Sequence, residues 1–316
     1  MKKRILITCG DANGIGPELG LKLFRVKELT EKFEMKIIGP EKIFGFYSKR
    51  LKIKAIPDTQ ILNLTYHGNF EPKPSETNET AGRIAGDAVK LGVDLCMKNY
   101  FDALVTLPLN KKSLNLAGYN YRGHTEMLAH LTSSKNTFMM MYSKNLKIVP
   151  LTIHIPLKKV PVSISKSTIM DLVISVNNNL VKTFKIRKPK IAILSLNPHS
   201  GDGGIIGGEE KKIIFPAVKL LSGMGFNING PFSSDGFFGS EMNKKFDVVI
   251  AMYHDQAMIP FKILSGDKGV NYTGGLKIIR TSPAHGTAFD IAGRGNADVT
   301  SSVEAVKLAG FLAEKN

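Results

Sequence analysis

The sequence predicts an α/β protein with a mostly parallel sheet, because short apolar runs alternate with longer amphipathic stretches along the whole chain. The apolar runs are nearly continuous and lack the regular polar positions of a half-exposed strand. This is typical of strands that helices cover on both faces. The length of 316 residues exceeds one average domain and favours two domains or one large one.

The first half of the chain contains three predicted strands, at residues 4–8, 35–39 and 103–107. Two amphipathic stretches, 18–24 and 81–99, predict helices, and Pro17 fits the first position of the earlier one. Residues 67–80 are rich in Pro, Asn, Glu and Thr. We interpret them as a surface loop rather than a linker, because helical patterning resumes directly afterwards.

The second half contains four predicted strands, at residues 147–153, 190–196, 247–252 and 277–281. Amphipathic stretches at 168–184 and 209–224 predict helices, and Glu209 and Glu210 open the second. The alternation of strands and helices therefore continues to the end of the chain, which indicates α/β layering throughout.

Composition excludes several classes of protein. Apolar residues make up 43% and charged residues 22%, as in a globular protein, and no apolar run reaches the roughly 18 residues of a membrane span. The start, "MKKRILITCG", lacks the pattern of a signal peptide, and Cys9 and Cys96 lie in apolar settings that predict buried free thiols. We therefore expect a cytoplasmic protein.

The net charge of +16 raises the possibility of nucleic-acid binding. However, the basic residues are spread along the chain, there is no zinc-finger spacing, and Trp is absent. The charge is better explained by a lysine-rich solvated surface, or by a basic cleft that attracts a small anionic substrate.

Histidines follow three of the predicted strands. His154, His199 and His254 each lie within three residues of a strand end, and of the seven histidines His67 and His130 alone lie outside such loops or residues 121–126. Ligands gather at the carboxyl ends of strands in α/β sheets, and three neutral imidazoles would suit a divalent metal. An isolated loop histidine usually has no such role, so the metal site is indicated by the recurrence of histidine at three strand ends.

Other candidate ligands surround this group. Lys262, Asn271 and Arg280 have the side chains of a phosphate clamp. The glycine-rich stretch "GDANGIGPE" (10–18) matches neither the dinucleotide fingerprint nor the P-loop, so it is either a ligand loop or a tight turn. The same two interpretations apply to "GDGGIIGGEE" (201–210).

Several motifs occur together and in order: "GDANGIGPE", "GHTE", Thr152-Ile153-His154-Ile155-Pro156, "LNPHSGDGG", "AMYHDQ" and "GVNYTGGLKIIRTSPAHGTAFDIAGRGNAD". With them, nearly the whole chain resembles the 4-hydroxythreonine-4-phosphate dehydrogenase family of pyridoxal 5′-phosphate biosynthesis. The last motif is also similar to the nucleotide loop of isocitrate and isopropylmalate dehydrogenases.

The resemblance implies a two-domain α/β/α fold of the isocitrate/isopropylmalate dehydrogenase type and a homodimer with its site at the interface. It implies a nucleotide-binding domain of residues 1–125 with 278–316, and a metal, substrate and dimerisation domain of residues 126–277. The implied reaction is oxidation of 4-phosphooxy-L-threonine by NAD or NADP with one divalent metal (Zn, Mg, Co or Mn). Its product, 2-amino-3-oxo-4-phosphooxybutanoate, decarboxylates to 3-amino-2-oxopropyl phosphate.

The family's functional positions map onto this chain by motif. The implied metal ligands are His154, His199 and His254, and the implied substrate ligands are His124, Thr125, Lys262, Asn271 and Arg280. The implied cofactor loop runs from His285 to Asp298 and includes Gly286, Thr287, Asp290 and Gly295. Lys262, Asp255 and Asp235 are candidates for the group that accepts the hydroxyl proton, with Lys262 ranked first.

The chain departs from the family pattern at four places. Ala12-Asn13 stands where Pro-Ala is usual, Ile205 replaces a histidine, Ala257 replaces a glycine, and Pro283-Ala284 replaces Val-Asp. All metal and clamp positions are kept. The departures bear on the substrate and on the choice between NAD and NADP.

Three alternatives remain open. The chain could oxidise a related sugar acid, D-threonate or D-erythronate 4-phosphate; retention of Lys262 and Arg280 favours such phosphorylated substrates over a dihydrodiol. A metal hydrolase would use the histidines to activate water and would need no nicotinamide. A nucleic-acid-binding protein would show tight, salt-dependent binding.

Overall fold

The computed structural model describes residues 1–66, 70–121 and 123–316, so His67 and Arg122 lie outside the described residues. The chain divides into two compact units. Unit 1 comprises residues 1–135 and 276–316, and unit 2 comprises residues 136–275. The predicted domain boundaries, after residues 125 and 277, differ from the boundaries of these units. The separate roles predicted for the two domains stay predictions.

Unit 1 contains a parallel sheet. Its strands, in spatial order, are β3 (Ile61–Asn63), β2 (Glu34–Gly39), β1 (Arg4–Thr8), β4 (Ala103–Thr106) and β11 (Arg280–Pro283). All residues of β4 and β11 are buried. Burial on both faces explains why β4 has no polar alternation in the sequence.

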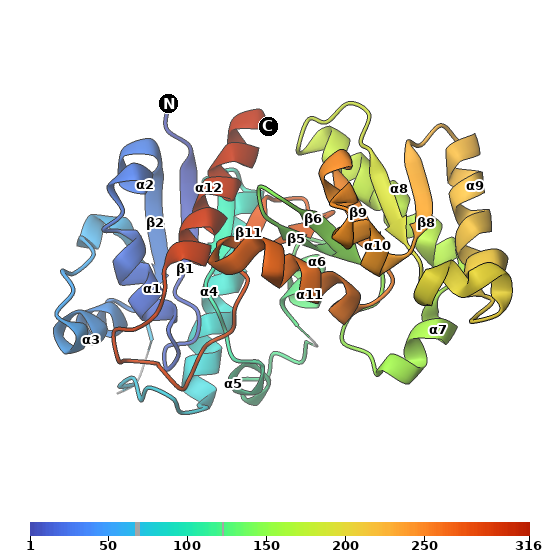
Figure 1. The fold of residues 1–316 in the computed structure, drawn as a ribbon. Coiled ribbons are helices and arrows are strands. Elements are labelled where there is room, and N and C mark those ends of the chain that lie inside the picture. Colours follow the sequence, from blue (N-terminus) through green and yellow to red (C-terminus); the bar gives the residue numbers. More distant parts are fainter. Residues whose placement is uncertain (67–69, 122) are drawn as a thin grey trace. The chain divides into compact units, whose positions relative to one another are not determined.

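The helices of unit 1 pack on this sheet or on the helices that cover it (Figure 1). They are α1 (Gly16–Leu23), α2 (Lys27–Lys32), α3 (Glu41–Leu51), α4 (Glu79–Met97), α5 (Lys111–Leu116), α6 (His124–Leu131) and α12 (Thr300–Lys315), with the 3₁₀ turn η1 (Asp58–Gln60). Both α4 and α12 contact β1 and β4. Asn78 begins α4 and Asn110 begins α5 because each side-chain oxygen accepts a hydrogen bond from a backbone N–H of the first turn.

Unit 2 contains a mixed sheet. Its strands, in spatial order, are β10 (Val270–Gly274), β5 (Phe138–Tyr142), β6 (Lys147–Pro150), β9 (Val248–Ala251), β7 (Ile191–Leu194) and β8 (Ile228–Phe232). Strand β5 is antiparallel to both of its neighbours, whereas β6, β9, β7 and β8 pair in parallel. The carboxyl ends of these four parallel strands therefore share one edge of the sheet.

The helical elements of unit 2 connect these strands. They are η2 (Leu157–Lys159), α7 (Val160–Ser163), α8 (Lys166–Lys182), η3 (Pro198–Gly204), the π-helical η4 (Glu210–Ile214), α9 (Phe215–Gly223), α10 (Ser234–Gly239), η5 (Met242–Lys245), α11 (His254–Ser265) and η6 (Gly266–Lys268). Helix α11 contacts β6 and β9. The helix predicted at 209–224 is thus a π turn followed by α9.

The α/β class with a mostly parallel sheet is confirmed, but several element limits differ from the prediction. The strand predicted at 147–153 ends at Pro150. The strand predicted at 277–281 begins at Arg280. Strands β3, β5, β8 and β10 were not predicted.

Both cysteines are free and buried, as predicted. Burial raises the pKa of each thiol to about 12, so both stay protonated at neutral pH. Among the residues that the structure describes, no helix is both long enough and apolar enough to cross a membrane.

Candidate active site

A guanidinium group is buried in unit 1. Arg280, the first residue of β11, is 1% exposed. Its Nε and Nη2 donate to Oγ1 of Thr106 at 3.0 and 2.5 Å, and Nη2 lies 3.2 Å from Nδ1 of His124. Burial lowers the pKa of Arg280 to about 9, which still leaves it charged at neutral pH. A buried cation of this kind is a strong binding group for an anion.

His124 lies beside this guanidinium at the start of α6. Burial, with the positive charges of Arg280 and Lys111, holds the pKa of His124 well below its usual value, so the ring is neutral at pH 7. Because Arg280 donates to Nδ1, the proton of the neutral ring must be on Nε2. Nε2 is buried and has no hydrogen-bond partner in the described part of the chain. His124 therefore presents a donor suited to a phosphate or carboxylate oxygen, and Thr125 follows it, half-buried, on the same turn.

Two of the predicted metal ligands lie together in unit 2. His154 follows β6 in a left-handed conformation (φ 51°), and His254 is the first residue of α11, which begins after Met252 and Tyr253, the two residues that follow β9. Since β6 and β9 are parallel neighbours, the two loops meet, and the ring centroids of the histidines are 6.1 Å apart. Both rings line a cavity of about 290 Å³.

Asp255 orients one of these rings. Its Oδ1 lies 2.7 Å from Nδ1 of His254, which places the Nδ1 proton toward the carboxylate and leaves the Nε2 lone pair available to a metal. The side chain of Asp255 is 71% exposed, so this contact acts mainly on ring orientation. Two imidazoles with one carboxylate partner suit Zn²⁺ or Co²⁺ as part of a ligand set.

The third predicted ligand, His199, lies on an exposed turn. Residues 199–203 of η3 all have positive φ, a left-handed path that Gly201 and Gly203 adopt without strain. His199 lies near Asp235 of α10, whose pKa is lowered mainly by a hydrogen bond from Ser233 and to a smaller extent by His199. Among residues 1–66, 70–121 and 123–316, no three His, Cys, Asp or Glu side chains are close enough together to hold a metal ion. The structure thus unites His154 and His254, but not His199 with them.

Gln256 connects the loops of this region. Its Oε1 accepts from the backbone N of Met252 at 2.6 Å, and its Nε2 donates to the backbone O of Ser195 and to Oγ of Ser234, each at 2.7 Å. These partners belong to the segments that carry His254, His199 and Asp235. Gln256 was not among the predicted site residues, although it follows His254-Asp255 in the same motif.

A buried carboxylate fixes the start of the loop that carries His199. Oε1 of Glu210 accepts from the backbone N of Leu196 and of Asn197 at 2.8 and 2.7 Å. Nδ2 of Asn197 donates to Glu209 and Glu210 at 2.8 and 3.0 Å. The first residues of the loop are therefore fixed, while His199 beyond them is exposed.

The remaining predicted residues of unit 2 lie on α10, α11 and β10. Asp235 and Asp255 line a second cavity, of about 480 Å³, which shares Tyr253 and Asp255 with the first. Lys262 is exposed on α11, on the same helix as His254. Asn271 is half-buried on β10, and its Oδ1 is buried without a hydrogen-bond partner in the described chain, as expected of a ligand group.

The predicted cofactor loop, residues 285–298, follows β11 in unit 1. The backbone O of Thr287 accepts from the backbone N of Ile15 at 3.1 Å. At its other end, Oδ1 of Asp298 accepts from the N of Thr300 at 2.7 Å, and the pKa of Asp298 is lowered first by a hydrogen bond from the Thr300 side chain and then by this backbone bond. His285 and Gly286 lie half-buried and exposed near the start of the loop, and Asp290 is exposed at its middle.

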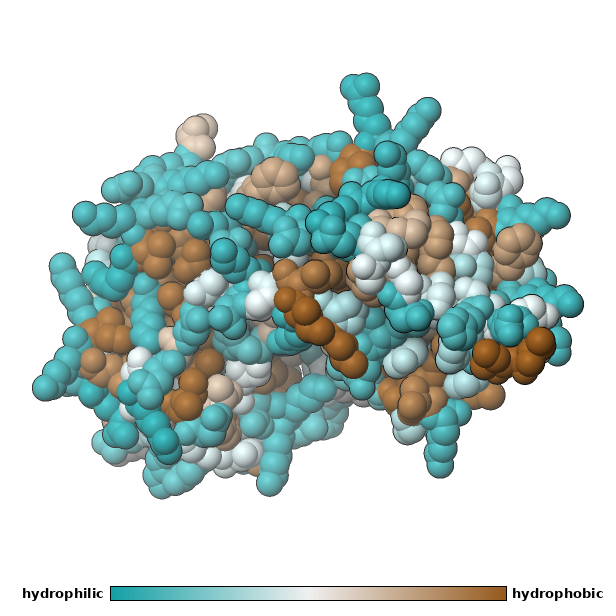
Figure 2. All heavy atoms as spheres, in the orientation of Figure 1, coloured by the Kyte–Doolittle hydropathy of each residue, from teal (hydrophilic) through white to brown (hydrophobic). Residues whose placement is uncertain are grey.

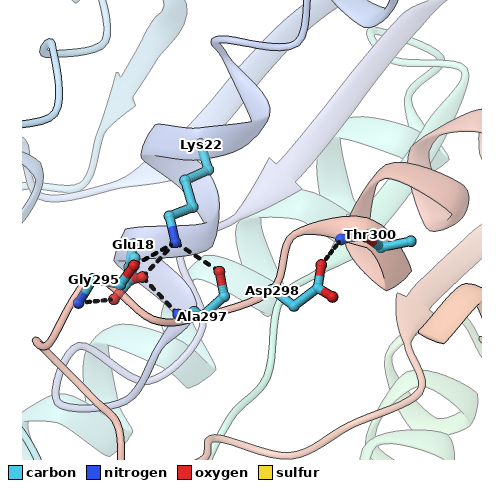
Figure 3. Close-up of polar contacts among 6 residues, drawn as sticks. All are labelled: Glu18, Lys22, Gly295, Ala297, Asp298 and Thr300. Carbon is cyan, nitrogen blue, oxygen red and sulfur yellow. Dashed lines mark hydrogen bonds and ion pairs between the residues drawn. The ribbon is translucent and has the colours of Figure 1, made fainter.

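A buried ion pair ties this loop to α1 (Figure 3). Glu18 is fully buried and accepts from the backbone N of Ala297 at 2.9 Å and of Gly295 at 3.3 Å. Nζ of Lys22 donates to Glu18 at 2.7 Å and to the backbone O of Gly295 and Ala297 at 2.9 and 2.6 Å. Both backbone groups of Ala297 are thus hydrogen-bonded to one helix turn, and the motif "GDANGIGPE" supports the loop rather than forming a P-loop.

Comparison with known proteins gives consistent matches. The family model of the pyridoxal phosphate biosynthetic protein PdxA matches residues 8–309. A 4-hydroxythreonine-4-phosphate dehydrogenase of Prosthecochloris aestuarii is 40% identical over 325 residues, covering 97% of this chain and 96% of the relative. A protein of Oceanobacillus iheyensis, proposed to be a D-threonate 4-phosphate dehydrogenase, is 37% identical, covering 99% of this chain and 98% of the relative.

Solved structures agree with these matches. The crystal structure of a 4-hydroxythreonine-4-phosphate dehydrogenase from Klebsiella pneumoniae is 32% identical, with a TM-score of 0.85, over 99% of this chain and 100% of that one. The resemblance drawn from the motifs is confirmed by these matches.

Proposed function

The chain belongs to the family of pyridoxal phosphate biosynthetic proteins PdxA, and on this premise we propose that it oxidises 4-phosphooxy-L-threonine with NAD or NADP. The product, 2-amino-3-oxo-4-phosphooxybutanoate, then loses CO₂ to give 3-amino-2-oxopropyl phosphate. Curated relatives at 37 to 41% identity over nearly the full chain are dehydrogenases of this substrate.

The observation that carries the proposal is the cluster of the buried Arg280 and Thr106 with the half-buried His124. It offers one fixed positive charge and one neutral N–H donor in a site with low solvent access. An anionic oxygen of the substrate, on its phosphate or its carboxylate, would satisfy both donors. We assign Thr125, Lys262 and Asn271 to the same substrate.

The divalent metal would be held by His154, His254 and His199. When bound, it would act as a Lewis acid that polarises the substrate oxygen and stabilises the negative charge left by decarboxylation. Asp255 fixes the tautomer of His254, and Gln256 connects the segments that carry His254, His199 and Asp235. The exposed position of His199 fits a ligand set that is completed between two copies of the chain.

Lys262 is our choice for the group that accepts the hydroxyl proton. Of the two other candidates, Asp255 contacts Nδ1 of His254, and Asp235 accepts a hydrogen bond from Ser233, so each already has a positioning role.

We propose that residues 285–298 bind the nicotinamide cofactor. The supporting observation is that the carboxyl end of this loop is held by Glu18 of α1 and by Thr300 of α12, whereas Gly286 and Asp290 are exposed and thus accessible to a ligand. The relative rates of reduction of NAD and NADP decide between the two cofactors.

We further propose a homodimer that forms through unit 2. The supporting observation is exposed apolar surface on α11, where Ile259 and Ile263 are 60% and 76% exposed, one helical turn apart. Figure 2 shows hydrophobic side chains gathered over this helix. Apolar patches rimmed by polar residues mark interaction surfaces. The compartment we propose is the cytoplasm, in line with two buried free thiols.

The test is NAD(P)H formation from 4-phosphooxy-L-threonine by metal-free protein, before and after addition of Zn²⁺, Mg²⁺, Mn²⁺ or Co²⁺. Metal-dependent reduction of either cofactor supports the proposal, and the ratio of rates identifies the preferred one. D-Threonate and D-erythronate 4-phosphate are assayed side by side, because one relative is proposed to act on D-threonate 4-phosphate. Faster turnover of either compound would replace the substrate while keeping the reaction. Turnover without nicotinamide would indicate the hydrolase alternative.

A further inference from the structure

Asn13 is a fully buried residue in the loop between β1 and α1 that anchors a distant segment of unit 1. Its Nδ2 donates to the backbone O of Glu76 at 2.9 Å, and its Oδ1 accepts from the backbone N of Lys73 at 2.8 Å. The backbone O of Asn13 also accepts from the N of Ser75 at 2.9 Å. One residue thus makes three hydrogen bonds to residues 73–76.

Residues 73–76 in turn contact the loop of residues 285–298. The hydroxyl of Ser75 donates to the backbone O of Phe289. A Cβ atom added to Gly293 would come within 2.9 Å of Pro74, so the two segments are in close contact there. The segment therefore lies between Asn13 and the loop and touches the loop at two points.

Residues 73–76 have little other support. Lys73, Ser75 and Glu76 are exposed, and Ser75 has a φ of 75°, in the left-handed region that disfavours a residue with a side chain. The hydrogen bonds to Asn13 hold the segment in this conformation. Without them it would regain conformational entropy and would hold the hydroxyl of Ser75 at Phe289 for less of the time.

We infer that Asn13 is a positioning residue for the cofactor: through residues 73–76 it holds the loop of residues 285–298 in its binding conformation before NAD or NADP arrives. The inference rests on the proposed function, which assigns that loop to the cofactor. A loop ordered in advance costs less entropy on binding, so the benefit is in cofactor affinity rather than in the chemical step.

Asn13→Ala is a specific test of this anchor, because alanine has no side-chain donor or acceptor for Lys73 and Glu76. Loss of the side chain also leaves Lys73 N and Glu76 O in exposed residues, where water can replace the lost bonds.

The experiment measures steady-state kinetics and NAD(P)H binding by fluorescence for wild type and Asn13→Ala, both metal-loaded. We expect KM for the cofactor and Kd for its reduced form to rise about tenfold, with kcat at saturating cofactor within about twofold of wild type. Asn63→Ala is the matched control, because Asn63 also accepts a backbone hydrogen bond, from Glu41, outside the loop contacts described above. Equal rises in Asn63→Ala, or no rise in Asn13→Ala, would overturn the inference.

Ser75→Ala tests the path. It removes the hydrogen bond to Phe289 and keeps Asn13. If Asn13 acts through residues 73–76, the double variant should lose less affinity than the product of the two separate losses. Full multiplicative losses would show that Asn13 and Ser75 act separately, and the proposed path would fall.

Hydrogen–deuterium exchange of the cofactor-free protein separates this inference from the proposed function. Asn13→Ala should speed exchange at residues 73–76 and 285–298, and unchanged exchange there would overturn the inference. If wild type neither bound nor reduced NAD or NADP, the proposed function would fail, and exchange would still decide whether Asn13 orders the loop.

Discussion

Arg280 of unit 1 is 1% exposed, whereas the side chain of His254 in unit 2 is 44% exposed. Arg280 is hydrogen-bonded to a hydroxyl and an imidazole of its own unit, so its position does not depend on a ligand. The polar neighbours of His254 are the imidazole of His154 and the exposed carboxylate of Asp255. In the described residues these groups do not make up a set of three metal ligands. The proposed anion site of unit 1 is therefore formed by the fold itself, whereas the proposed metal site of unit 2 requires at least one more group.

The largest effect is expected where a site depends on few groups. His254→Ala should lower turnover about 10³-fold and abolish binding of stoichiometric Zn²⁺ or Co²⁺, because one of two adjacent imidazoles is lost. Metal content by mass spectrometry and NAD(P)H formation check this. His130→Ala is the matched control, since His130 is an exposed residue of unit 1 that contacts Tyr121. Retention of full metal content in His254→Ala would remove it from the ligand set.

Arg280→Met should act on substrate binding rather than on metal content. We expect kcat/KM to fall about 10²-fold while metal binding stays intact, because the variant removes the buried charge that attracts the anion. Arg4→Met is the control, since Arg4 pairs with Asp102 in the same unit and is 39% exposed. Thermal melting confirms that both variants are folded.

The pH dependence of substrate affinity tests the role of the Arg280 charge. The pKa of Arg280 is lowered to about 9, so the group is charged below that pH and becomes neutral above it. Substrate affinity should therefore fall as pH rises above 9, by up to about tenfold per unit. Arg280→Met should lack this limb. His124 should add no inflection near pH 6.5, because its lowered pKa keeps it neutral there.

A smaller effect is expected from Gln256→Ala. It removes three hydrogen bonds that connect the segments of His254, His199 and Asp235 but leaves the proposed ligands in place. Metal affinity should therefore fall about tenfold, with near-normal kcat at saturating metal. Calorimetric titration of the metal-free protein with Co²⁺ measures this, and Gln60→Ala, in the 3₁₀ turn η1, is the control. An equal loss of kcat at saturating metal would assign Gln256 to the reaction itself.

Elements with a local sequence signal could be predicted, whereas elements that depend on distant residues could not. Val248–Ala251 was predictable because burial on both faces requires a continuous apolar run, and that run is visible locally. Strand β10, with Asn271, Thr273 and Gly274, has no such signature; it is a strand because it pairs with β5, which is more than a hundred residues earlier. Helix α11 escaped prediction because it begins at His254 itself and contains Pro260.

The candidate site was likewise predictable only where its residues carry a local sequence signal. His154 and His254 were predicted from their positions at strand ends, and the structure brings them together because β6 and β9 are neighbours. Thr106 was missed because its partner Arg280 is 174 positions away, and a threonine carries no local sign of such a contact. The motifs identified ligands, but the residues that hold those ligands appeared with the tertiary structure.

The bond between Glu18 and Ala297 also has a consequence for synthesis of the chain. Its two partners are 279 positions apart, so at bacterial or eukaryotic translation rates roughly a quarter of a minute to a minute passes between them. Unit 2, a continuous stretch from 136 to 275, is complete before residue 297 is made. Unit 1 is begun first but is completed last, and until then the carboxylate of Glu18 lacks the backbone donors of Gly295 and Ala297. The ribosome thus finishes the second unit before the first.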